Sequence, residues 1–117
     1  MILHFDKSQR QGVTVLEFKG SIHSGPDCRQ IEKEIESIIH AGHNKLVLDL
    51  THLTHIDSSA IGSIVRCISK VKGADGMMRI AGPTGMVEQA FKITQLHKVI
   101  EIFPTVDEAV ARFTPAS

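Results

Sequence analysis

The chain has 117 residues, and its 13 Lys and Arg residues balance 13 Asp and Glu residues, so the formal net charge is zero. This length is typical of one domain, which we assign to residues 1–117, and 42% hydrophobic with 22% charged residues is typical of a globular protein. These values argue against a basic nucleic-acid-binding surface and a membrane-inserted segment, and the absence of a signal-peptide pattern favours a cytoplasmic protein.

The first part of the chain predicts two strands and a helix. Ile2–Phe5 is expected to form an edge strand, which a polar turn joins to a second strand at Val13–Phe18. A helix follows, because Ser24 or Gly25 can cap it and Pro26 suits a first turn, where a missing N–H is tolerated. Its expected buried face has five residues at helical spacing: Cys28, Ile31, Ile35, Ile38 and Ile39.

The middle of the chain predicts a buried strand followed by a second helix. Lys45–Leu50 is almost continuously apolar, as in a central strand of a parallel sheet, and Thr51–His55 is expected to be a polar connection. From Ser58 the apolar residues change to helical spacing, which predicts a helix that ends at Gly73 or Gly76. Its expected buried stripe consists of Ile61, Ile64, Val65, Ile68 and Val71.

The last third predicts two short strands, at Met77–Ala81 and Val99–Ile102, each followed by a helix. Thr84 can cap the first of these helices, and Thr105 with Glu108 forms a capping box for the second. The resulting order is β-β-α-β-α-β-α-β-α. It predicts an α/β fold with a mixed, mostly parallel sheet, an N-terminal β-hairpin and about four helices.

The segment Asp57-Ser58-Ser59 joins the buried strand to the second helix, where such sheets place functional sites. One interpretation is a helix cap, since these side chains can accept bonds from the free N–H groups of the first turn. The other is a phosphorylation switch at Ser58, where a phosphate adds about −1.5 to −2 charges that the helix dipole tolerates. The outward helix face expected to bind a partner consists of Ser59, Gly62, Ser63, Arg66 and Lys70.

Two stretches resemble the signature of STAS domains and, more narrowly, of bacterial anti-sigma factor antagonists. They are Leu46-Val47-Leu48-Asp49-Leu50 and Ile56-Asp57-Ser58-Ser59-Ala60-Ile61-Gly62. The resemblance covers nearly the whole chain and implies a STAS-like fold and a binding module that is not an enzyme. It implies that the unphosphorylated form sequesters an anti-sigma factor that is also a GHKL-type serine kinase. It further implies that this kinase phosphorylates Ser58 and that a PP2C-type phosphatase removes the phosphate. The alternative is a constitutive STAS scaffold in a signalling or lipid-transport complex, without phosphorylation.

Two residues differ from the pattern of that family. Ala60 stands where members usually carry Gly, and its methyl group is expected to narrow the approach of a partner. His23 stands where many members have Asp, and a histidine titrates near neutral pH and both donates and accepts hydrogen bonds. His23 is therefore expected to alter the bonding that faces the kinase. We include His23 and Asp57 among the predicted partner-binding residues.

The histidines suggest two further kinds of chemistry. The pairs His40-x-x-His43 and His52-x-x-His55 have the spacing of metal ligands, but neither has a matching Cys or carboxylate cluster. His55, Asp57 and Ser58 are the residue types of a hydrolase triad, but near-neighbours in one turn do not align as nucleophile, base and orienting group. We therefore expect no metal, no cofactor and no catalysis. The sequence does not specify an oligomeric state.

Overall fold

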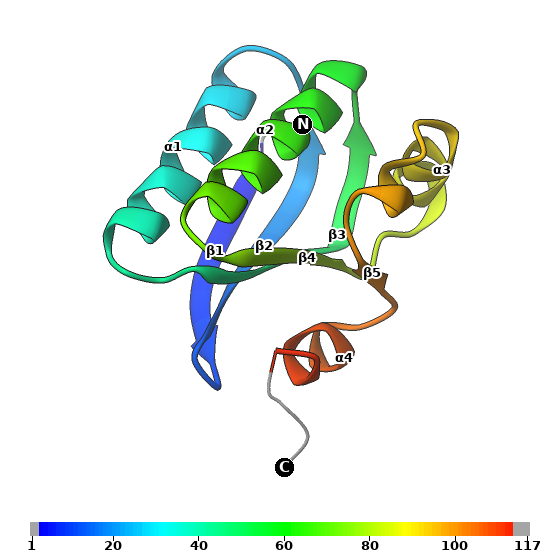
Figure 1. Ribbon diagram of the computed structural model, residues 1–117. Coiled ribbons are helices and arrows are strands. Elements are labelled where there is room, and N and C mark those ends of the chain that lie inside the picture. Colours follow the sequence, from blue (N-terminus) through cyan, green and yellow to red (C-terminus); the bar gives the residue numbers. More distant parts are fainter. Residues whose placement is uncertain (1–2, 114–117) are drawn as a thin grey trace.

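The computed structural model describes residues 3–113, which form a five-stranded sheet with four α-helices and one 3-10 helix (Figure 1). The strands are β1 His4–Arg10, β2 Val13–Ile22, β3 Lys45–Ile56, β4 Met77–Ala81 and β5 Ile102–Phe103. The helices are α1 Pro26–His40, α2 Ser58–Gly73, α3 Gly85–Ile93 and α4 Val106–Ala111, with the 3-10 helix at Leu96–Lys98. The strands lie in the order β1-β2-β3-β4-β5, with β1 and β2 antiparallel and the other neighbours parallel. The predicted α/β fold with its N-terminal hairpin is confirmed.

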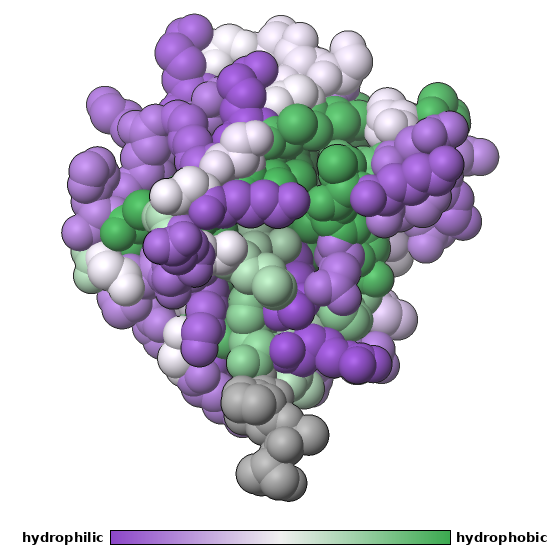
Figure 2. Space-filling model, in the orientation of Figure 1, coloured by the Kyte–Doolittle hydropathy of each residue, from purple (hydrophilic) through white to green (hydrophobic). Residues whose placement is uncertain are grey.

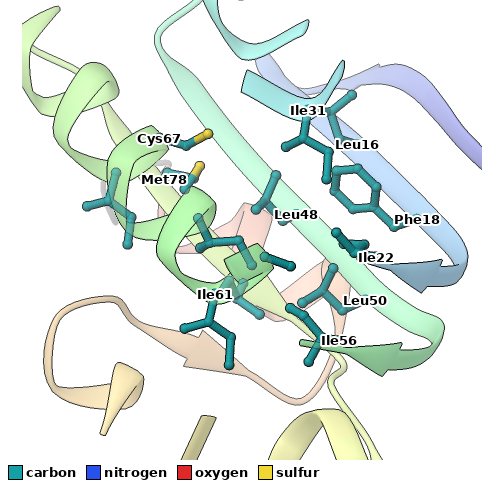
Figure 3. Packing of buried hydrophobic residues seen from close by; sticks show 14 of the residues in the cluster. Leu16, Phe18, Ile22, Ile31, Leu48, Leu50, Ile56, Ile61, Cys67 and Met78 are labelled. Carbon is teal, nitrogen blue, oxygen red and sulfur yellow. The ribbon is translucent and has the colours of Figure 1, made fainter. Parts of the chain in front are cut away.

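Helices α1 and α2 cover one face of the sheet, and α4 lies on the other (Figure 1). The main core fills the space under α1 and α2, where Phe18, Ile31 and Leu48 are almost fully buried (Figure 3). Successive strand residues point to opposite faces, so a second and smaller cluster forms under α4. It consists of Val13, Val15, Val47, Ala81, Ala109 and Val110.

Strand β1 runs over His4–Arg10, so it includes only His4 and Phe5 of the predicted Ile2–Phe5, and Ile2 lies outside the described part of the chain. The turn that follows is only Gln11 and Gly12, with φ angles of 54° and 80°. Two positive φ angles are typical of a type I′ hairpin turn, whose twist matches that of the flanking strands. The antiparallel pairing therefore continues to the base of this turn, and polar residues suit the exposed edge that β1 forms.

Strand β3 continues through Thr51–His55, which the sequence predicts as a polar connection. Neighbouring strand β2 pairs with β3 as far as Ile56, whereas β4 reaches only to Asp49. The extension is thus bordered by one strand only, and its polar side chains point mostly to solvent. This extension carries the carboxyl end of β3, and the residues that follow it, beyond the end of β4.

The strand predicted at Val99–Ile102 is mostly absent, because β5 consists of only Ile102 and Phe103. Val99 follows the 3-10 helix and is 54% exposed, so it does not join the sheet. The predicted N-cap of this helix is confirmed, since Thr105 Oγ1 accepts the N–H of Glu108 at 3.2 Å. That cap is what begins α4 directly after β5.

Helix α2 begins and ends as predicted, at Ser58 and Gly73. Its apolar stripe is buried except for Val65, which is 40% exposed. Figure 2 shows hydrophobic surface between α2 and α3, whereas the surface over α1 is mostly hydrophilic. The inclusion of Val65 in the buried stripe is therefore wrong, because none of the elements described for residues 3–113 covers that side of α2 completely.

Candidate functional site

Asp57 and Ser58 lie at the junction between the carboxyl end of β3 and the start of α2. Asp57 is the N-cap residue, and its Oδ1 accepts the N–H of Ala60 at 2.8 Å. This bond satisfies one of the free N–H groups of the first turn and fixes the start of the helix. Because Asp57 supplies the cap, the hydroxyl of Ser58 is not needed for it, and both Ser58 and Ser59 are exposed.

The other carboxylate oxygen of Asp57 binds the loop between β2 and α1. Its Oδ2 accepts the N–H of Ser24 at 2.9 Å, and the backbone N–H of Asp57 donates to the carbonyl of Ile22 at 3.3 Å. The bond from Ala60 and, after it, the bond from Ser24 hold the pKa of the Asp57 carboxyl below its usual value. Asp57 is therefore ionised at neutral pH and holds the two loops together.

His23 is exposed in this same loop, one residue after the end of β2. Its backbone N–H donates to Asp27 Oδ2 at 3.1 Å, and its Nδ1 lies 3.9 Å from Asp57 Oδ2. The fold thus brings His23 and Asp57 together, although 33 residues separate them in the sequence. A protonated imidazole here would attract any anionic group added at the start of α2, whereas an aspartate would repel it.

The methyl group of Ala60 does not narrow the approach of a partner, contrary to the prediction. Ala60 is 0% exposed and belongs to the main core, so its methyl group points inward. Gly62 is half-buried, and a Cβ atom built there would have Arg66 Nη1 at 3.7 Å as its nearest neighbour. The outer surface at the start of α2 is therefore shallow, and Ala60 does not change that.

Ser63 does not lie on the outward face of α2, where the sequence prediction places it. It is 0% exposed, and its hydroxyl oxygen lies 2.7 Å from Glu32 Oε2, to which it donates. The reason is the position of α1, which packs along this side of α2 and covers Ser63. A helical-wheel projection of α2 alone leaves this small side chain exposed. Ser63 thus joins two helices and is not available to a partner.

Arg66 and Lys70 lie on the surface of α2, and carboxylates of α1 hold both of them. Arg66 donates to Glu32 through Nε at 3.2 Å and through Nη2 at 3.3 Å, and Lys70 pairs with Glu36. The bonds from Arg66 and, after them, the bond from Ser63 lower the pKa of the Glu32 carboxyl. The sequence prediction missed Glu32, because no spacing within one helix indicates a pair between two helices.

The structure also bears on metal binding, on membrane insertion and on thiol chemistry. Within residues 3–113, no group of three or more His, Cys, Asp or Glu side chains is placed to hold a metal ion. None of the helices in that range has the length and apolar character of a membrane span. Burial raises the pKa of the Cys67 thiol to about 12, so this cysteine is a packing residue and not a reactive thiolate.

Sequence comparison places this geometry in a known family. The STAS domain family matches residues 4–109. Over 75 residues the chain is 31% identical to a protein of Thermotoga neapolitana that is named as a candidate anti-sigma factor antagonist. The aligned stretch is 64% of this chain and 66% of that relative, which is slightly less than two thirds of its length.

Solved structures share the fold. A candidate anti-sigma factor antagonist from Thermotoga maritima has a TM-score of 0.84 and 23% identity, over 92% of each chain. The phosphorylated form of the Bacillus cell fate determinant SpoIIAA has a TM-score of 0.73 and 18% identity, over 95% of this chain and all of that one. Its unphosphorylated form has been solved too, also with a TM-score of 0.73. Because the family match extends over almost the whole described structure, the chain belongs to the STAS domain family.

Proposed function

We propose that this STAS domain is an anti-sigma factor antagonist whose binding to an anti-sigma factor is switched by phosphorylation of Ser58. The observation that carries the proposal is the exposed hydroxyl of Ser58 directly after Asp57, on a helix start that the Asp57 carboxylate fixes. A kinase reaches this hydroxyl without any unfolding of the domain. The domain itself acts by binding and not by catalysis.

The partner in this proposal is an anti-sigma factor that is also a serine kinase of the GHKL type. A PP2C-type phosphatase removes the phosphate, and all three proteins meet in the cytoplasm. Both enzymes follow from the resemblance to anti-sigma factor antagonists. The relative SpoIIAA, solved in unphosphorylated and phosphorylated forms, supports a switch in which the fold survives the modification.

The contact surface in the proposal surrounds Ser58. Ser59 and Gly62 give a shallow surface on the first two turns of α2, and His23 borders it from the β2–α1 loop. Arg66 and Lys70 lie further along the helix, where these cations and their carboxylate partners on α1 together present both signs of charge. Ser63 is not part of this surface, because it is buried.

Phosphorylation acts in this proposal through charge. A phosphate adds about −1.5 to −2 charges beside Asp57, which is already ionised. Two like charges about 4 Å apart repel by on the order of 4 kcal/mol at an effective dielectric of about 20. Each ~1.4 kcal/mol changes affinity about tenfold, so one phosphate facing a carboxylate of the partner weakens binding by up to about a thousandfold.

The proposal is tested by incubating the protein with ATP and the GHKL-type kinase encoded nearest to it. Intact-protein and peptide mass spectrometry are expected to show one phosphoryl group on Ser58, none in Ser58→Ala, and an unchanged yield in Ser59→Ala. Calorimetry is expected to show kinase binding by Ser58→Ala and weaker binding by Ser58→Asp. Equal binding by both variants, without phosphate on the wild type, would favour the constitutive scaffold.

A further inference from the structure

A depression lies at the end of the sheet opposite Ser58. It has a volume of about 280 Å³ and is lined by residues at the starts of β3 and β4 and just after α4. Strands β3 and β4 are parallel and both begin at this end, whereas Asp57 follows the far end of β3. In Figure 1 the first turn of α2 is accordingly at the top of the molecule and α4 is at the bottom.

The charged side chains of the depression are mostly cationic. Lys45, Arg79 and Arg112 line it, and Asp75 is the carboxylate among its lining residues. Lys45 and Arg112 are both exposed. Within residues 3–113 neither of them forms an ion pair, although other cations on the surface do pair with carboxylates. Three like charges around one small depression repel one another, so an anion bound there would lower the electrostatic energy.

Arg79 is the unusual member of this group, because it is only 7% exposed. Its Nε donates to Glu101 Oε1 at 3.2 Å, and the Phe113 ring covers its guanidinium with 4.1 Å between the guanidinium carbon and the ring centroid. Among the atoms of residues 3–113, its buried Nη1 has no hydrogen-bond partner. Native structures rarely leave a buried charged donor unpaired, so this nitrogen indicates a missing acceptor.

We propose that this depression binds a small oxyanion group, a phosphate or a carboxylate, between Arg79, Lys45 and Arg112. A guanidinium presents its N–H groups as a planar fork that matches two oxygens of such a group. Glu101 pairs with Nε, the Phe113 ring covers the guanidinium and the Phe103 ring centroid lies 5.9 Å from its carbon, so Nη1 is the donor that the ligand would satisfy. The site is separate from Ser58, so ligand and anti-sigma factor bind at the same time.

The test is a titration of the ¹⁵N-labelled full chain with sodium phosphate and, separately, sodium acetate, with sodium chloride keeping the ionic strength constant. Amide shifts are expected to saturate at Lys45, Met77 and Arg79. The anion that binds more tightly identifies the phosphate or the carboxylate class. Lys45→Gln and Arg112→Gln are each expected to weaken binding about tenfold. The matched control is Lys98→Gln, which removes an exposed cation far from the depression and leaves binding unchanged.

The substitutions are made at the exposed residues Lys45 and Arg112 and not at Arg79, because Arg79→Gln also removes the contact with Phe113 and thus affects folding. Shifts that rise without saturation, or that Lys98→Gln reduces as much as Lys45→Gln does, would mean an adventitious ion only and would overturn the proposal. Saturating shifts confined to the first turn of α2 would overturn it as well. None of these outcomes depends on the phosphorylation of Ser58.

Discussion

The two faces of the sheet are built very differently. One is covered by α1 and α2, with 15 and 16 residues, over a large continuous core. The other is covered by α4, with six residues, over a small cluster and a buried arginine. A helix as short as α4 is not stable by itself, so it depends on its tertiary contacts. The junction at Ser58 therefore rests on the strongly packed face, and the depression at Arg79 borders the weakly packed one.

The largest expected effect compares one buried aliphatic residue from each face. Ile64→Ala is expected to lower the free energy of unfolding by about 3 to 4 kcal/mol, because it removes buried carbon atoms and leaves a cavity under α1 and α2. Val110→Ala in α4 is expected to cost about 2 kcal/mol, since fewer atoms are lost and the short helix can relax. Urea unfolding measures both. Equal losses would contradict the comparison, because Val110 loses fewer atoms and would then have to be packed more tightly than Ile64.

The second-largest loss of stability is expected from Asp57, at the junction between β3 and α2. Asp57→Ala is expected to lower the free energy of unfolding by about 1 to 2 kcal/mol, because the first turn of α2 loses its cap and the Ser24 loop loses an acceptor. Asp57→Asn is the matched control, since an asparagine oxygen also caps a helix. Urea unfolding is expected to place Asp57→Asn between the wild type and Asp57→Ala.

The difference in unfolding free energy between the wild type and Asp57→Asn is expected to depend on pH. The folded-state pKa of Asp57 lies below its ordinary value of 3.8, so the unfolded chain takes up a proton first as the pH falls. The extra stability of the wild type over Asp57→Asn is therefore complete above that ordinary value and disappears as the pH falls through the folded-state pKa. A difference that persists unchanged at the lowest pH would mean that the Asp57 charge does not stabilise the junction.

A smaller effect is expected from the buried bond between α1 and α2. Ser63→Ala is expected to cost about 1 kcal/mol, because Glu32 loses a hydrogen-bond donor in a packed interface. Exposed Ser59 is the matched control, and Ser59→Ala is expected to change the unfolding free energy by less than about 0.5 kcal/mol. Thermal unfolding measures both. A neutral Ser63→Ala would show that Glu32 finds enough bonds from Arg66 alone.

Features set by neighbours in the sequence were predictable. The limits of α2 follow from helical spacing and from Asp57, which caps the turn that directly follows it. The cap of α4 follows from Thr105 and Glu108. The position of the candidate site, at the end of β3, follows from the alternation of strands and helices.

Features set by distant partners were not predictable. The continuation of β3 beyond Leu50 depends on pairing with β2, and polar residues there look like a loop in the sequence. The burial of Ser63 and the role of Glu32 depend on how α1 lies against α2. Val99 lies outside the sheet because it directly follows a 3-10 helix, and the apolar pattern around Val99 does not indicate this helix.

The smallest expected effect concerns the ion pair that joins the hairpin to α4. Arg10 of β1 pairs with Asp107, and the two side chains are 46% and 79% exposed. Solvent and salt screen such a pair, so Arg10→Gln is expected to change the unfolding free energy by at most about 0.5 kcal/mol. A double-mutant cycle with Asp107→Asn isolates the coupling between the two charges, and repeating it at high salt is expected to remove what remains. A coupling above about 1 kcal/mol would mean that this exposed contact holds α4 in place, and that the weakly packed face is stabilised from its rim and not from its small core.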